Sequence, residues 1–92
     1  MIDGTAEEVQ RARWVARRNL ERWLGRNPAA AEVASRRAEL EAEITETQEH
    51  LAHVAELRNL SPARFDRLAW DMKQRIRVAA AEVELLNGWT PS

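Results

Sequence analysis

The sequence predicts an all-α protein, a three-helix antiparallel bundle built on a long, coiled-coil-like helical hairpin. Three observations predict it: apolar side chains recur at helical spacing, helix-starting and helix-ending residues divide the chain into three segments, and the linkers are short. Short connections make consecutive helices antiparallel neighbours. Because 92 residues are enough for one domain, we expect a single helical domain over residues 1–92.

The first predicted helix covers residues 5–24. Thr5 and Glu8 have the spacing of a capping box, in which the Thr hydroxyl accepts from one backbone N–H and the Glu carboxylate from another. Gly25 is a candidate for the left-handed residue that ends the helix, and Pro28 cannot continue it. One apolar stripe runs along this helix and predicts its buried face: Val9, Ala12, Ala16, Leu20, Trp23 and Leu24.

The second predicted helix covers residues 28–58, with Asn27 as its N-cap and Pro28 at its first position. At 1.5 Å per residue it would be roughly 46 Å long. Its apolar stripe follows steps of four and three, as in a coiled coil, with two polar interruptions. The stripe consists of Val33, Arg37, Leu40, Ile44, Thr47, Leu51 and Val54.

The third predicted helix covers residues 62–87. Ser61 is the expected N-cap, Pro62 fits the first turn, and Leu60 is placed to contact Phe65 as a hydrophobic staple. Gly88 is expected to end the helix in the left-handed conformation, with Trp89 folded back onto the last turn. The heptad stripe is unbroken here: Phe65, Ala69, Met72, Ile76, Ala79, Val83 and Leu86.

The first helix, at roughly 30 Å, is too short to cover the whole hairpin. We therefore expect an uncovered apolar seam near the turn between the second and third helices, formed by Leu51, Val54, Phe65 and Met72. This seam is predicted to pack against a second copy of the chain or a helix of another protein. A small core supports the same expectation, because 16 of the hydrophobic residues are Ala and no Cys is present to form a disulfide.

Two clusters of Trp and Arg are the candidate partner-binding sites. Each Trp lies away from the apolar stripe of its helix, and Trp and Arg are enriched at interface hot spots. The alternative is that another helix or a second subunit covers each Trp within the fold. The first cluster consists of Trp14, Arg11, Arg17 and Arg18, and the second of Trp70, Arg67 and Arg77.

Composition and motifs favour binding over catalysis. The net charge of −1 gives no strong overall field for nucleic acid or an anionic membrane. Glu46, His50 and His53 share one side of the second helix, but their spacing matches no common metal motif, so we expect neither a metal nor another cofactor. No glycine elbow accompanies a Ser and no Gly-rich phosphate loop is present.

The sequence thus predicts a non-catalytic protein interaction module: an oligomerising adaptor, a small structural component or an inhibitor of a larger protein. Its expected partner is another protein or itself, as a homo-oligomer. A nucleic-acid-associated regulator that uses the Arg-rich face of the first helix is the alternative. With neither a membrane-spanning apolar run nor a signal-peptide pattern, a cytoplasmic location is expected.

Overall fold

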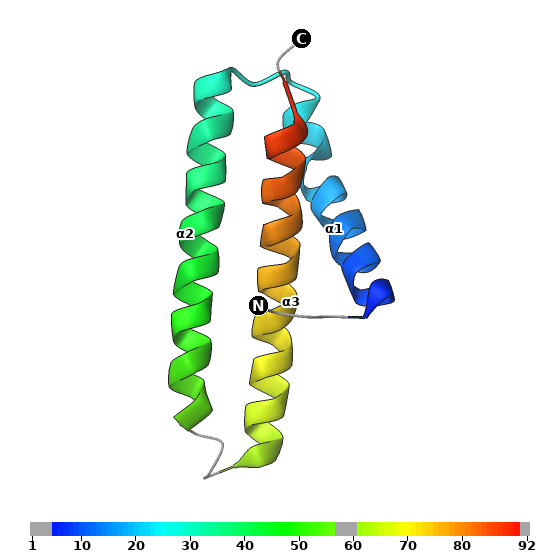
Figure 1. Ribbon diagram of the computed structural model, residues 1–92. Helices are drawn as coiled ribbons and strands as arrows, with labels where there is room; N and C mark the ends of the chain where they lie inside the picture. The colour runs from blue at the N-terminus through cyan, green and yellow to red at the C-terminus, as the bar shows by residue number, and fades with distance from the viewer. Residues whose placement is uncertain (1–4, 57–60, 91–92) are drawn as a thin grey trace.

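The computed structural model describes residues 5–56 and 61–90, which form three α-helices (Figure 1). Helix α1 spans Ala6–Leu24, α2 spans Ala30–Val54 and α3 spans Pro62–Gly88. No strand occurs in these residues, and the predicted all-α class is confirmed. Helix α2 begins two residues later than predicted and ends four earlier, because residues 55–56 form a short 3-10 turn. No helix within the described ranges is long and apolar enough to cross a membrane.

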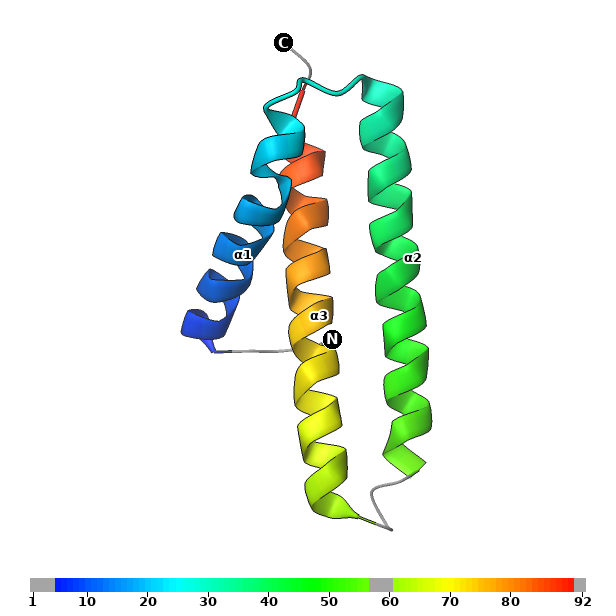
Figure 2. The same cartoon turned by 180° about the vertical axis from the view of Figure 1, so that it is seen from behind.

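Helix α3 lies at the centre of the molecule, with α2 on one side and α1 on the other (Figures 1 and 2). Helix α2 runs antiparallel to α3, whereas α1 runs parallel to α3. The backbones of α1 and α2 do not contact each other; these two antiparallel helices meet through side chains near their connecting loop. The reason is that α3 buries two faces: Ala79 lies on the stripe toward α2, and Ala81, which points roughly 160° away, is also buried.

The core is densest at the end of the molecule where the loop joins α1 to α2. Leu20, Val33, Leu40, Ala79 and Leu86 form one buried cluster to which all three helices contribute. Around it pack the half-buried side chains of Trp23, Leu24, Ile44, Val83, Leu85 and Trp89. All seven positions of each predicted heptad stripe in α2 and α3 are buried or half-buried, which confirms these stripes as the faces that pack in the hairpin.

The helix ends agree with the predictions only in part. Thr5 Oγ1 accepts a hydrogen bond from the Glu8 backbone N–H at 3.2 Å, as predicted. The left-handed residue between α1 and α2 is Asn27, with φ 53°, whereas Gly25 is right-handed with φ −62°. Asn tolerates the left-handed region better than other residues with a Cβ, so Asn27 forms the turn and Ala29 takes the N-cap position of α2. The Ala29 N–H donates to Glu32 Oε2 at 3.1 Å.

The predicted cap interactions are also missing at the two ends of α3. Ser61 occupies the N-cap position but its side chain makes no capping hydrogen bond; its carbonyl instead accepts from Phe65 N–H at 3.0 Å. The predicted staple from Leu60 lies outside the described residues. Gly88 belongs to the helix and is not left-handed, and Trp89 continues as extended backbone with its ring against the core.

Candidate interaction surfaces

The outer face of α1 carries the first predicted cluster. Ala12, Ala16 and Leu20 turn toward α3 and are buried, which places Trp14 on the opposite side of the helix, 58% exposed. The Arg18 guanidinium carbon lies 5.0 Å from the centroid of the Trp14 ring, within the range of a cation–π contact. A flat aromatic surface with a cation stacked on it therefore faces solvent.

Arg11 and Arg17 are also exposed on α1, beside Trp14 and Arg18. The structure thus brings the four members of this predicted cluster onto one solvent-facing part of a single helix. Over residues 5–56 and 61–90 no other helix covers Trp14, in contrast to the alternative in which a helix of the same chain would bury it.

Trp70, from the second predicted cluster, is 57% exposed on α3. It lies seven residues before Arg77 and therefore on the same side of α3. Helix α1 covers this side at Arg77 and beyond, toward the C-terminus of α3. Helix α1 begins at Ala6, next to Arg77, so it does not extend as far as Trp70. Arg67 is exposed near Trp70. The part of this side of α3 that α1 leaves uncovered is thus the N-terminal part, which carries Trp70 and Arg67.

Arg77 does not join that exposed cluster. Its side chain is only 11% exposed, and its Nη1 lies 3.1 Å from Glu8 Oε2. Sequence reasoning placed Arg77 on a solvated face because it did not foresee that α1 lies parallel on α3. Arg77 therefore belongs to the packing between α1 and α3, and Glu8, predicted as the second half of the capping box, is its partner.

The predicted self-association seam is largely closed within the chain. Val54 and Met72 are buried, at 5% and 8% exposed, and Leu51 and Phe65 are half-buried. All four lie on the stripes along which α2 and α3 pack, so the hairpin covers them itself. Among the described residues, the large apolar side chains that remain exposed are Trp14, Trp70, Leu68 and Val9.

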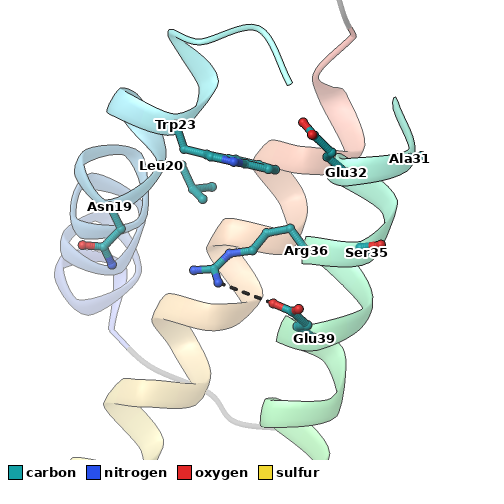
Figure 3. Close-up of a pocket in the computed structure, with 8 residues that line it drawn as sticks. All are labelled: Asn19, Leu20, Trp23, Ala31, Glu32, Ser35, Arg36 and Glu39. Carbon is teal, nitrogen blue, oxygen red and sulfur yellow. Dashed lines mark ion pairs between the residues drawn. The ribbon is translucent and has the colours of Figure 1, made fainter. Parts of the chain in front are cut away.

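A groove of about 570 Å³ runs between α1 and α2 near their connecting loop (Figure 3). The Trp23 ring lies across it, and Arg36 extends from α2 toward α1 while pairing with Glu39 at 3.6 Å. An adjoining groove of about 390 Å³ shares Asn19 and Arg36 and reaches Glu82 on α3. Both are open channels between helices, lined by side chains of mixed charge.

Glu82 is a buried carboxylate that sequence reasoning missed. It is 6% exposed, and burial raises its pKa, while a side-chain hydrogen bond with Asn19 and the positive charge of Arg36 act in the opposite direction. Glu82 lies three residues after Ala79 and four before Leu86, and this helical spacing from two buried positions is the signal that could have revealed its burial. Since Asn19 and Arg36 come from α1 and α2, Glu82 links both outer helices to α3.

His50, His53 and Glu46, the residues considered as metal ligands, are all exposed on α2. Across the described ranges, no three His, Cys, Asp or Glu side chains are gathered in an arrangement able to hold a metal ion. Comparison with protein-family models, with curated proteins and with solved structures found no match to this chain.

Proposed function

We propose that this chain is a helical protein interaction module, which binds another protein or a second copy of itself and catalyses no reaction. The observation that carries the proposal is the exposure of two large aromatic side chains: Trp14 is 58% and Trp70 57% exposed. A chain with so few bulky apolar residues would gain stability by burying them, about 25 cal/mol per Å² of apolar surface. Their position on the surface is better explained by burial against a partner.

The surroundings of the two Trp side chains support this proposal. Trp14 lies among exposed Arg side chains on α1, and Trp70 lies on the part of α3 that α1 leaves uncovered. Large aromatic and Arg side chains make the greatest energetic contributions at protein interfaces. Because the two surfaces belong to different helices, the module has two separate places at which to bind a protein.

Capture of proteins from native lysate with a tagged chain, with and without nuclease, tests the proposal. If a Trp is an interface hot spot, Trp14→Ala or Trp70→Ala should reduce retention of the captured protein by roughly 30-fold, the equivalent of about 2 kcal/mol. Arg64→Ala, at an exposed position of α3 that lies on a different side of the helix from Trp70, is the control and should retain it. Sedimentation of the same variants reports self-association. The proposal fails if neither Trp substitution changes capture or self-association.

A nucleic-acid-associated role is the second candidate, because Arg11, Arg17 and Arg18 are exposed together and Arg18 stacks on Trp14. Arg side chains contact phosphates and an aromatic ring stacks on bases. This role predicts an affinity for DNA or RNA that falls steeply with salt and is lost when the three Arg residues are replaced by Gln. A titration with labelled oligonucleotides at two salt concentrations measures both effects.

A further inference from the structure

The charged residues of α1 and α2 suggest what covers the outer face of α1. Resting on the interaction function above, we propose that the occupant is a second copy of this chain. The outer face of α1, defined here as the exposed surface around Trp14, docks antiparallel on the outer face of α2 of the neighbouring copy. Copies therefore associate head to tail.

The outer face of α1 is basic. The charged side chains that α1 turns toward α3 are paired there: Glu8 with Arg77 at 3.1 Å, and Arg13 with Glu84 at 3.8 Å. Those left on the outside are four exposed Arg and two exposed Glu: Arg11, Arg17, Arg18, Arg22, Glu7 and Glu21. None of the four Arg side chains forms an ion pair with a described acidic residue. The positive charge on this face is therefore available to an acidic partner.

The outer face of α2 is acidic. Residues 30–54 contain six Glu and two Arg. Two of these Glu are used locally, Glu32 at the N-terminus of α2 and Glu39 by Arg36. Glu41, Glu46 and Glu49 are exposed and have no ion-pair partner among the described residues. Glu46 and Glu49 lie on the side of α2 opposite its buried stripe and Glu41 lies on the flank, roughly 90° from the stripe; this exposed surface is defined here as the outer face of α2.

The spacing of the charges matches when the two helices are antiparallel. Arg11 and Arg18 are seven residues apart, about 10 Å along the helix, and Glu41 and Glu49 are eight apart, about 12 Å. Pairing Arg18 with Glu41 and Arg11 with Glu49 places Trp14 opposite residues 45–46, in the middle of the segment. Exposed Thr45 lies there, and its short side chain leaves room for the indole ring.

The fold already orients α1 and α2 in the antiparallel sense that this contact requires, and each copy has one α1 face and one α2 face. Helices α1 and α2 lie on opposite sides of α3 and run antiparallel (Figures 1 and 2). Copies placed side by side in the same orientation therefore bring α1 of one against α2 of the next in the antiparallel sense. Such a contact is heterologous, so a pair of copies still has one free α1 face and one free α2 face for further copies.

The contact is small. Helix α1 has 19 residues, so it is about 28 Å long, and a helix about 10 Å wide offers roughly 300 Å² of outer face. A standard stable interface buries about 800 Å² per partner. The association should accordingly be reversible, with a dissociation constant in the micromolar range or above, and it should weaken as salt screens the charges.

Sedimentation velocity with charge-reversed variants of the full chain tests the proposal, over about 10 µM to 1 mM protein at about 50 mM and 500 mM salt. The wild type should associate with rising concentration at low salt and be monomeric at high salt. R11E/R18E and E41R/E49R should each lose at least tenfold in association constant. Their equimolar mixture should recover it, because each outer face again meets the opposite charge. R64E/K73E makes the same charge change at exposed positions of α3 and should behave like the wild type.

A wild type that stays monomeric up to about 1 mM at low salt overturns the proposal, as does a mixture that fails to recover association. So does self-association that E41R/E49R leaves unchanged. Far-UV circular dichroism verifies that both variants remain helical. If these results are negative while lysate capture still depends on Trp14, the partner is a different protein and the interaction function stands. Salt-dependent binding to DNA that R11E/R18E abolishes would assign the face to nucleic acid instead.

Discussion

The attachment of α1 to α3 depends on Leu20, and its truncation gives a quantitative test of the fold. Leu20 is 1% exposed and is the α1 side chain in the buried cluster that joins all three helices. Leu→Ala substitutions in cores cost about 2–5 kcal/mol, depending on how far the site can relax. The groove beside Leu20 is open to solvent, so Trp23 and neighbouring side chains have room to move into the space. We therefore expect a cost at the lower end, about 2–3 kcal/mol.

That cost is large for a chain of this size. At 0.05–0.15 kcal/mol per residue, 92 residues give a free energy of unfolding of about 5–14 kcal/mol. For a domain of this length each kcal/mol lowers Tm by about 4–8 °C, so Leu20→Ala should lower Tm by about 10–20 °C. Thermal denaturation followed by circular dichroism at 222 nm, a wavelength that reports helix content, measures the shift.

Val9→Ala is the matched control, because Val9 lies on the same helix and is 36% exposed. Its truncation should cost less than about 1 kcal/mol. Equal Tm shifts for the two variants, or a shift below about 4 °C for Leu20→Ala, would refute the reasoning that Leu20 anchors α1.

Three further substitutions test other parts of the structure. Glu82→Gln should stabilise the chain at pH 7, because burial raises the pKa of Glu82 and its ionisation therefore favours the unfolded state as pH rises. Urea denaturation should show that the gain in the free energy of unfolding shrinks toward pH 4. A gain that is independent of pH would contradict this cause. Thr5→Ala should cost about 0.5–2 kcal/mol, because it removes the oxygen that accepts the Glu8 N–H; an unchanged Tm would show that the cap contributes nothing. Ala16→Leu should lower the free energy of unfolding by about 1–3 kcal/mol, because Ala16 is fully buried and the larger side chain forces α1 away from α3. In the same denaturation assay, Ala52→Leu at an exposed position should be nearly neutral.

The hairpin could be predicted from the sequence because its signal is a strict period. The stripes of α2 and α3 combine large apolar residues at steps of four and three, and only burial against a neighbouring helix explains that pattern. Even Arg37, a polar interruption in the α2 stripe, is accounted for: it is half-buried and donates through Nη1 to Asn87 Oδ1 at 3.1 Å. A side chain with a long apolar stem and a polar end can occupy such a position.

The position of α1 could not be predicted in the same way. The face of α3 that receives it contains Ala81 and Arg77, a small residue and a charged one, and neither differs in type from residues found on a solvated helix face. Helix α1 covers this face, where Ala81 is buried and Glu8 pairs with Arg77 at 3.1 Å. A charge that is buried through a partner distant in the sequence leaves no periodic signal. Glu82 differs, because it lies three residues after buried Ala79 and four before buried Leu86.

The central position of α3 also determines where the molecule can bind. Along its C-terminal half, α3 is covered by α2 on one face and by α1 on the opposite face, so little of that half remains for a partner. The surfaces left for the proposed binding are therefore the outer faces of α1 and α2 and the exposed surface of α3 around Trp70. The outer faces are opposite in charge and lie on opposite sides of the molecule, so a contact between them extends from copy to copy and closes only if the rotation between copies forms a ring. The Trp70 surface is on a different helix and stays uncovered in either case, so under the proposed function one chain would be able to bind its own copies and a different protein at the same time.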